Sequence, residues 1–257
     1  MTTNDSQKPK LDIKKEVAGI ISKEAFENII SKSKVKKSPV KKVTIENTKN
    51  IDSYHHGDLK KALLEAGLKI LKNDGAHNLS LREIAKVAGV SHTAPYRHFK
   101  NKEEIIASLA EEGFILLKNN LEQVIERYRD NPREQIFNAG KVYLKVAIEN
   151  PEYFNIMFGG FINDQTKYEN LEKVSAQAFD RFVYIIRAGQ KSEMIREDDP
   201  KEITLAIWSM LHGLSTLLIN RSLNFLNVDQ DRYELHLGKI ISLFVSGIKK
   251  RVIVTDL

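Results

Sequence analysis

Apolar residues recur along this chain every three or four positions, with polar residues between them, which is typical of amphipathic helices. Asn131-Pro132 and Asn150-Pro151 mark helix boundaries, because the residue before a proline is biased away from helical backbone angles. The predicted helices cover about residues 59–72, 81–88, 102–127, 133–149, 151–158, 174–193, 201–222 and 232–251. No competing strand pattern is found, so the sequence predicts an all-α protein.

The stretch 79–102 has the pattern of a helix-turn-helix. Ser80 and Glu83 form a capping box that predicts the start of a first helix, and Gly89 supplies the left-handed backbone of a sharp turn. A second short helix is expected from His92 to about Phe99. Pro95 falls in its first turn, where a missing donor is tolerated. Many helical hairpins bind nothing, but a capping box, a turn glycine and a polar second helix together favour DNA binding.

Residues 53–105 resemble the TetR family of transcriptional regulators. The resemblance rests on the lead helix YHHGDLKKALLEAGLKILKNDGAHN, on SLREIAKVAGVS and on the run from Tyr96 to Lys102. It implies a three-helix helix-turn-helix DNA-binding domain over residues 51–104, followed by a helical effector-binding and dimerisation domain over 105–257. Pro95 departs from the family pattern, which usually has a non-proline packing residue there.

The DNA contacts expected from this resemblance divide into base and phosphate contacts. Arg82 matches a position that reads a base, and guanine is its expected partner. Arg97 is expected at either a base or a phosphate. The residues expected to face base edges are His92, Thr93 and Ala94, although Ala94 is also expected to pack on the first helix. The residues expected to hold phosphates are Ser80, Tyr96, His98 and Lys102.

Within the body, AGKVYLKVAIENPEYFNIMFGG and the later Trp208-Ser-Met-Leu-His212-Gly213 resemble the TetR subgroup whose C-terminal domain is named for Trp-His-Gly. Trp208 and His212 are one turn apart and share a helix face, and Gly213 permits a close helix approach. The pair is either a packed, hydrogen-bonded part of the core or part of a mostly apolar effector pocket. The candidate pocket residues are Tyr143, Phe154, Met157, Phe158, Phe161, Tyr184, Trp208 and His212.

The last two predicted helices carry apolar stripes wider than one helix contact within a single chain would use. Pairing them with a twofold copy gives a four-helix bundle, which would fix the distance between two recognition helices. The expected interface residues are Ile207, Leu211, Leu214, Leu218, Leu237, Ile241, Phe244 and Ile248.

Composition narrows the chemistry further. The absence of cysteine excludes disulfides and thiolate metal sites, and fits a reducing cytoplasm. No apolar run approaches the roughly 18 residues that span a bilayer, so we expect a cytoplasmic protein. The adjacent His55 and His56 point in divergent directions and no third ligand follows at ligand spacing, so no metal is expected. The histidines are scattered and the sequence has no phosphate-binding glycine loop. We therefore expect that the protein is not an enzyme and has no cofactor.

The net charge of +6 is concentrated at the N-terminus, where residues 1–50 hold 12 lysines and six acidic residues. We expect this lysine-rich extension to be largely flexible. It is either a solubilising tail or an arm that lies along phosphates flanking the operator.

These patterns predict a homodimeric repressor that a small, mostly apolar ligand releases from a near-palindromic operator. The alternative is a DNA-bound structural or division-control protein of the same fold that has no small-molecule effector. A large apolar cavity in the body would distinguish the first from the second.

Overall fold

A computed structural model of the chain describes residues 56–223 and 233–248. The predicted N-terminal extension lies outside these residues. The described α-helices are α3 (His56–Asp74), α4 (Leu81–Ala88), α5 (Lys102–Arg127), α6 (Pro132–Glu149), α7 (Pro151–Phe158), α8 (Glu169–Lys191), α9 (Pro200–Ile219) and α10 (Tyr233–Ile248). The short 3-10 turns are η1 (Ala76–Asn78), η2 (Pro95–Arg97) and η3 (Gln165–Lys167). The described part is all-helical, which confirms the predicted fold class.

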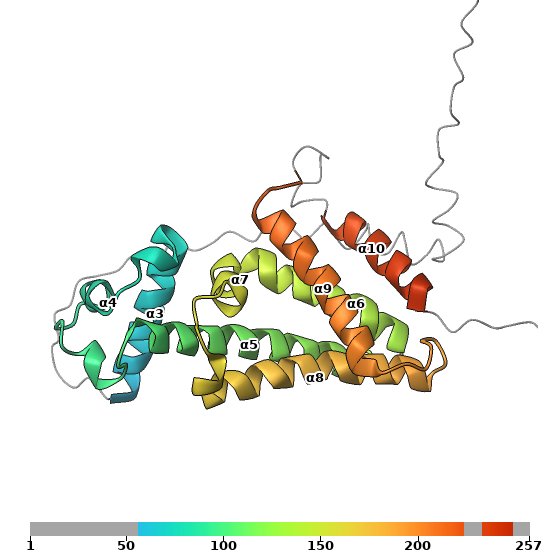
Figure 1. The fold of residues 1–257 in the computed structure, drawn as a ribbon, viewed down its shortest axis with the longest axis horizontal. Helices are drawn as coiled ribbons and strands as arrows, with labels where there is room; N and C mark the ends of the chain where they lie inside the picture. The colour runs from blue at the N-terminus through green and yellow to red at the C-terminus, as the bar shows by residue number, and fades with distance from the viewer. Residues whose placement is uncertain (1–55, 224–232, 249–257) are drawn as a thin grey trace, which may run out of the picture. The chain divides into compact units, whose positions relative to one another are not determined.

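Helix α5 is the long central element of the described fold (Figure 1). Its first turns pack against α3, and further along it lies beside α8 and contacts α6 and α7. Helix α9 packs on α6 and α8, and α10 packs mainly on α6. Leu109 and Leu121 of α5 are fully buried, so this helix carries the hydrophobic core from the helix-turn-helix into the body.

Side-chain caps start the helices where the sequence places them. The Asn101 side chain accepts a hydrogen bond from the Glu104 N–H at 2.9 Å at the start of α5. The Asn131 side chain likewise accepts from the Glu134 N–H at 3.2 Å, with a proline as the first residue of α6. These side chains satisfy donors that the first helical turn leaves without a partner. The predicted starts of α5 and α6 are confirmed to within one residue.

One glycine shows how closely the helices approach. A Cβ at Gly113 of α5 would lie 2.5 Å from Sδ of Met157 in α7, too short for a van der Waals contact. The absence of a side chain at position 113 therefore lets α7 lie directly against α5.

Helix α9 is apolar enough, by length and composition alone, to cross a membrane, although the sequence had suggested no such run. About a third of its most apolar stretch, 33%, is buried in the chain. A core helix passes the same test, and α9 packs on α6 and α8, so this single helix is weak evidence for a membrane span.

Candidate nucleic-acid interface and aromatic cluster

The turn between the two halves of the helix-turn-helix has the predicted geometry. Ser80 Oγ accepts a hydrogen bond from the Glu83 N–H at 3.2 Å and caps α4. At the other end, Gly89 has φ 69°, and the Val90 N–H donates to the Ala85 carbonyl at 3.0 Å. This is the left-handed helix end that glycine favours. The expected capping box would have turned the Glu83 carboxylate toward the backbone N–H of Ser80. The carboxylate instead lies 3.0 Å from Lys86 Nζ.

The second helix of the motif is shorter than predicted. An α-helix from His92 to Phe99 is wrong, because only the 3-10 turn η2 is formed there. The Ala94 N–H donates to the Ser91 carbonyl and the Arg97 N–H to the Ala94 carbonyl, both to the third residue back. Proline has no N–H to offer to the fourth residue back. Pro95 therefore prevents a regular α-helical ladder in its first turn.

Most of the expected DNA-contacting side chains reach solvent. Those classed as exposed are Ser80, Arg82, His92, Thr93, Tyr96 and Arg97. The Tyr96 side chain is the most apolar of these, and 56% of its residue surface is accessible. We call these six residues the reader surface. Their exposure allows contact with DNA, and their individual roles stay predictions.

The other three residues expected to contact DNA are not exposed in the same way. Ala94 is buried, with 9% exposed, so the expectation that it faces base edges is wrong and the expectation that it packs inward is confirmed. His98 is half-buried, and its Nε2 atom is enclosed. The Lys102 ammonium donates to the carbonyls of Ala76 at 2.7 Å and His77 at 3.3 Å. A phosphate would have to compete with these carbonyls for Lys102.

The aromatic side chains of the body form a cluster drawn from four helices. Its members are Tyr143 of α6, Phe154 and Phe158 of α7, Phe179 and Phe182 of α8, and Trp208 and His212 of α9. The His212 ring stacks on Phe154 with centroids 4.9 Å apart, and the Phe158 ring meets it at 4.8 Å in an edge contact. We call this group the aromatic cluster.

A chain of hydrogen bonds runs through the aromatic cluster. The Trp208 indole N–H donates to the Tyr143 hydroxyl oxygen at 2.8 Å, and this hydroxyl lies 3.2 Å from His212 Nδ1. The hydroxyl oxygen has two lone pairs, so the tautomer of His212 decides whether the tyrosine O–H or the imidazole Nδ1–H donates in this second bond. The reading of Trp208 and His212 as a packed, internally satisfied pair therefore fits the observed contacts.

Burial keeps both groups neutral. It raises the pKa of the Tyr143 hydroxyl well above its ordinary value, and the hydrogen bond from Trp208 opposes this rise. Burial also lowers the pKa of His212. The charged form of each group is disfavoured because the surrounding rings solvate it poorly.

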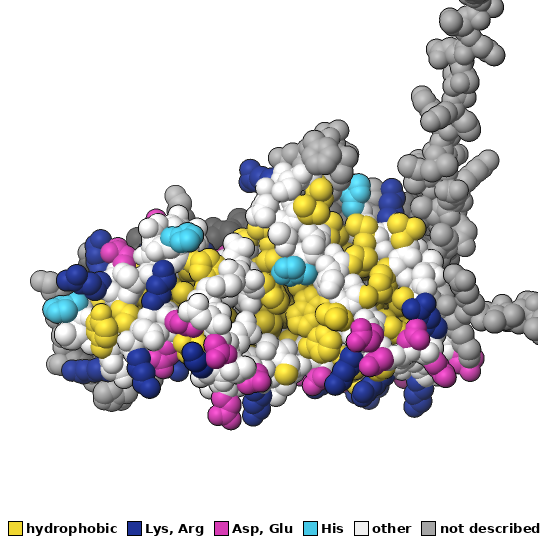
Figure 2. Space-filling view, viewed as in Figure 1, with side chains coloured by type: hydrophobic (Ala, Val, Ile, Leu, Met, Phe, Trp, Pro, Cys, Tyr) yellow, Lys and Arg dark blue, Asp and Glu magenta, His cyan; other side chains and the backbone are white. Residues whose placement is uncertain are grey.

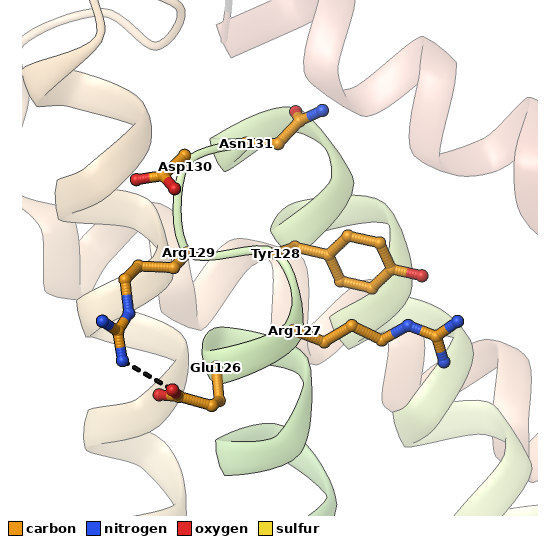
Figure 3. Close-up of a pocket in the computed structure, with 6 residues that line it drawn as sticks. All are labelled: Glu126, Arg127, Tyr128, Arg129, Asp130 and Asn131. Carbon is orange, nitrogen blue, oxygen red and sulfur yellow. Dashed lines mark hydrogen bonds and ion pairs between the residues drawn. The ribbon is translucent and has the colours of Figure 1, made fainter.

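Two pockets in the described residues lie outside the aromatic cluster. One, of about 410 Å³, is at the turn between α5 and α6 and is open to solvent; Glu126 and Arg129 form an ion pair beside it (Figure 3). The other, of about 300 Å³, lies between the α3–η1 segment and α7. Neither is lined by Trp208 or His212, so an effector pocket around these residues stays a prediction.

Two residues expected in that effector pocket lie elsewhere. Tyr184 is 51% exposed on the outer side of α8, and the Phe161 ring lies 6.0 Å from the His77 ring at the second pocket. The helical spacing of Tyr184 places it on the opposite side of α8 from Phe182, which is buried.

The expected dimer interface residues are mostly buried within the chain. Leu211 is fully buried, and Ile207 and Phe244 are half-buried. The other buried members are Leu214, Leu218, Leu237, Ile241 and Ile248. The six buried side chains pack within the hydrophobic core of the chain itself and are not available to a partner. A dimer interface that includes Ile207 and Phe244 stays a prediction.

A different face of α9 and α10 is open. Leu205 is 54% exposed and Leu217 43% exposed on α9, and Leu243 is 75% exposed on α10. Gly213 lies on the same face of α9, and a Cβ there would meet nothing within 4 Å, so no described helix of the chain makes the expected close approach at this glycine. Figure 2 shows hydrophobic side chains gathered over α9 and α10. We call these four residues the open apolar face.

A helix-turn-helix with exposed polar side chains, joined by a long helix to an all-helical body, defines a DNA-binding regulator. Comparison with family models identifies the family. Residues 63–109 match the model described as bacterial regulatory proteins, tetR family, and residues 136–237 match the tetracyclin repressor-like C-terminal domain. The chain belongs to the TetR family of transcriptional regulators. The Trp-His-Gly subgroup stays a resemblance.

Two curated relatives carry different functional names. The fatty acid metabolism regulator protein of Bacillus subtilis is 29% identical over 97 residues, which are 38% of this chain and 44% of that protein. The nucleoid occlusion factor SlmA of Marinobacter nauticus is 26% identical over 138 residues, 54% of this chain and 69% of that protein. The chain thus spans less than half of the first relative.

Solved structures share the fold over most of the chain. A Rhodococcus sp. RHA1 protein of unknown function is 27% identical with a TM-score of 0.66, covering 77% of this chain and 98% of that one. The fatty acid degradation regulator FadR of Bacillus halodurans is 16% identical with a TM-score of 0.58, covering 77% of this chain and 100% of that one. The second likeness shows the fold alone.

Proposed function

We propose that the chain is a homodimeric repressor that binds a near-palindromic operator and is released by a small, mostly apolar ligand. The observation that carries the DNA-binding part is the reader surface, where basic, polar and aromatic side chains reach solvent from both halves of a helix-turn-helix. In this proposal, two copies place their recognition turns in successive major grooves, about 34–36 Å apart.

The DNA contacts follow from chemistry and position. Arg82 is exposed in the first turn of α4, where its fork of donors suits the O6 and N7 acceptors of guanine. His92 and Thr93 are the other candidates for base edges. Tyr96 and the Ser80 hydroxyl, whose oxygen already caps α4, remain able to donate to phosphates. Base contacts would specify sequence, and phosphate contacts would set register.

The effector proposal rests on the aromatic cluster and on a relative's name. A mostly apolar ligand suits the half-buried rings of Phe158, Phe179 and Trp208, which form the accessible edge of the cluster. The fatty acid metabolism regulator among the relatives suggests a fatty acyl compound. Such a ligand would have to displace packed rings, and its effect on DNA affinity would be about 1–3 kcal/mol, as is usual for coupled sites.

One observation favours a second candidate. The Tyr143 hydroxyl, the Trp208 indole N–H and His212 Nδ1 already bind one another, so these atoms need no ligand as a partner. Together with the match to a nucleoid occlusion factor, this favours a DNA-bound division-control protein without a small-molecule effector. Adding a fatty acyl compound to the preformed DNA complex separates the two candidates, because only the repressor would release its DNA.

The proposal includes no catalysis and places the protein in the cytoplasm with its DNA. One relative is named a fatty acid metabolism regulator and the other a nucleoid occlusion factor. Among the residues that the structure describes, no group of three or more His, Asp or Glu side chains is positioned to hold a metal ion. DNA, a second copy of the chain and a small effector are the proposed partners.

The DNA-binding part is tested by selecting bound sequences from a random DNA pool with the full-length protein. We expect enriched sequences with twofold symmetry, because a closed dimer presents two equal reader surfaces. A pool without enrichment, in which all sequences bind equally, would contradict the proposal. The selected operator then serves in the ligand-release experiment.

The dimer is tested by Leu243→Glu on the open apolar face. Leu243 is 75% exposed, so the substitution costs a single chain little, whereas a dimer would bury an unpaired carboxylate. We expect monomers in sedimentation and an operator affinity lower by about a hundredfold or more, as two-site binding is lost. Tyr184→Glu, on the outer side of α8, is the matched control and should leave the dimer intact. A Leu243→Glu protein that still sediments as a dimer would show that the interface does not include Leu243.

A further inference from the structure

The pocket of about 300 Å³ lies where the helix-turn-helix domain meets the body. We call it the junction cavity. Its walls come from both sides: Leu71, Gly75 and Ala76 precede the helix-turn-helix, and Glu152, Asn155, Ile156, Gly159 and Phe161 belong to α7 and the residues after it. Leu71 and Ile156 are buried and apolar, and Phe161 is half-buried. The cavity therefore offers apolar walls and one acidic side chain.

The acidic side chain is unusually enclosed. Only 6% of the Glu152 side chain is exposed, although carboxylates are rarely buried unless they are paired. It lies in the first turn of α7, directly after Pro151, where the helix dipole favours negative charge. The junction cavity thus has a nearly enclosed carboxylate in its wall.

The chain's own cation satisfies this carboxylate incompletely. Lys72 Nζ lies 3.0 Å from Glu152 Oε1, but the lysine side chain is 51% exposed. The approach is not aligned for a hydrogen bond to this enclosed oxygen. A flat cation with two parallel N–H donors would fit a carboxylate better, because it can bind both oxygens at once.

The apolar wall suits a flat group attached to that cation. Gly159 lets the Phe161 ring lie back over the end of α7, since a Cβ there would come 2.8 Å from the ring and 2.2 Å from the Asn155 carbonyl oxygen. The Phe161 ring also meets the His77 ring edge-on, with centroids 6.0 Å apart. This places an aromatic surface close to the buried carboxylate.

We propose that the junction cavity is a binding site for a compact organic cation that carries one flat apolar group, such as an aryl amidine. The cationic group takes the place of the Lys72 ammonium at Glu152, and the ring lies against Leu71, Ile156 and Phe161. A ligand in this cavity contacts both the helix-turn-helix domain and the body. The site is separate from the aromatic cluster and does not depend on the effector proposed there.

The first test needs no variant. Benzamidine and its neutral counterpart benzamide are titrated into the full-length protein, with binding followed by calorimetry. We expect benzamidine to bind at least about tenfold more tightly, because only the cation can pair with a buried carboxylate. Equal affinities, or no benzamidine binding at millimolar concentration, would overturn the proposal.

Two substitutions then locate the site and act in opposite directions. Glu152→Gln keeps the shape and removes the charge, so benzamidine affinity should fall at least about tenfold. Lys72→Met removes the competing internal cation, so benzamidine should bind several-fold more tightly. Lys61→Met is the matched control: Lys61 is on the same helix and pairs with Glu65, but both side chains are well exposed. It should leave the affinity unchanged.

Circular dichroism checks that each variant is folded. If Lys72→Met does not fold, Lys72→Gln replaces it, since glutamine keeps a donor near Glu152 while removing the charge. Unchanged affinity in Glu152→Gln, or weaker benzamidine binding in the folded Lys72 variant, would overturn the assignment to the junction cavity.

Discussion

The reader surface and the aromatic cluster differ in the partners of their polar groups. On the reader surface, the side chains of Arg82 and Tyr96 reach solvent. In the aromatic cluster, the polar atoms of Tyr143, Trp208 and His212 bind one another among packed rings. DNA can therefore replace water around Arg82 and Tyr96 without breaking bonds inside the protein. A ligand that enters the cluster must replace bonds that are already made, so an effector response involves a conformational cost.

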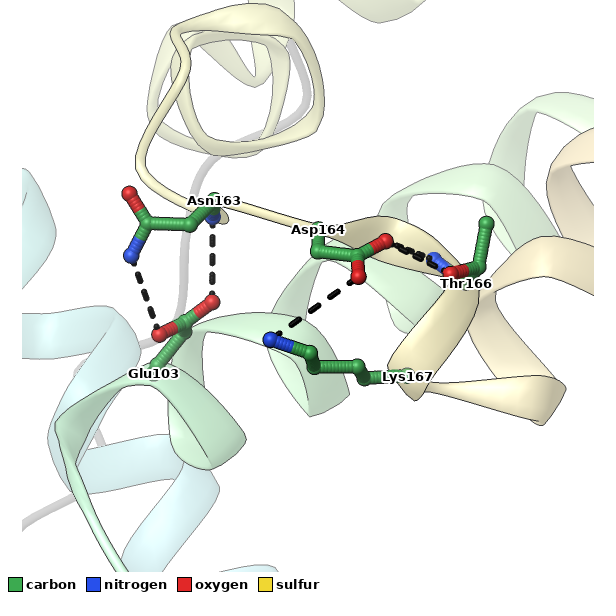
Figure 4. A network of polar contacts seen from close by, with 5 residues as sticks. All are labelled: Glu103, Asn163, Asp164, Thr166 and Lys167. Carbon is green, nitrogen blue, oxygen red and sulfur yellow. Dashed lines mark hydrogen bonds and ion pairs between the residues drawn. The ribbon is translucent and has the colours of Figure 1, made fainter.

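The segment that follows α7 contacts the first turn of α5. The Glu103 carboxylate, in the first turn of α5, accepts hydrogen bonds from the Asn163 N–H at 3.0 Å and from its side-chain amide at 3.3 Å (Figure 4). Asp164 then accepts from the Thr166 N–H at 3.1 Å and lies 3.8 Å from the Lys167 ammonium. This segment follows α7, which carries two rings of the cluster. The residues after α7 are thus hydrogen-bonded to the first turn of α5.

The largest effect should come from Tyr143→Phe. The substitution leaves the Trp208 N–H without its acceptor and His212 Nδ1 without its hydrogen-bond partner in a largely buried place. We expect the free energy of unfolding to fall by about 2–3 kcal/mol, measured by urea denaturation. The operator affinity of the folded protein should not change. Tyr184→Phe, at a half-exposed position on α8, should lose less than about 0.5 kcal/mol. Equal losses in the two variants would show that the hydrogen-bonded chain contributes nothing.

The same chemical change on the reader surface should have the reverse outcome. Tyr96 is 56% exposed, so Tyr96→Phe should leave the free energy of unfolding within about 0.5 kcal/mol of the original. If its hydroxyl donates to a phosphate, affinity for operator and for random DNA should each fall by about 1 kcal/mol, because a phosphate contact carries no sequence information. A stability loss without any loss of DNA affinity would remove the contrast between the two regions.

The smallest effect is a pH dependence from His212. Burial lowers its pKa, so the unfolded chain binds the proton first as the pH falls. The contribution of neutral His212 to stability is therefore complete above its ordinary value of 6.5 and decreases as the pH falls below it. Urea denaturation at pH 7.5 and pH 5 should show a smaller loss in His212→Gln than in the original protein. The exposed His77→Gln serves as the control. If His212→Gln and the original protein lose equal stability, His212 is not the group responsible.

Local patterns predicted the first half of the motif well. The cap at Ser80 and the left-handed turn at Gly89 depend on residues within a few positions of each other, so the sequence contains the needed information. The second helix was predicted wrongly. Its length and type depend on the backbone hydrogen bonds around Pro95, and these form only the 3-10 turn η2. Local pattern thus predicts a helix end well where a single capping side chain or glycine determines it, as at Ser80 and Gly89.

The body was less predictable because its contacts join distant residues. Leu211 and Leu217 both belong to the apolar stripe of α9, yet one is fully buried and the other 43% exposed. Helical spacing cannot say which part of a wide stripe packs on the same chain. The pairing of Lys72 with Glu152 likewise joins two helices that are far apart in sequence. Neither could be inferred without the tertiary arrangement.

Sequence reading by the reader surface is tested most directly with Arg82→Ala. Affinities for the selected operator and for random DNA are measured at one salt concentration, with Arg187→Ala, an exposed arginine on α8, as the control. We expect Arg82→Ala to lose about 1–3 kcal/mol on the operator, less on random DNA, and to relax preference at one base pair in each half-site. Equal losses on operator and random DNA would show that Arg82 contacts only phosphate, and would contradict the account of how this chain recognises its operator.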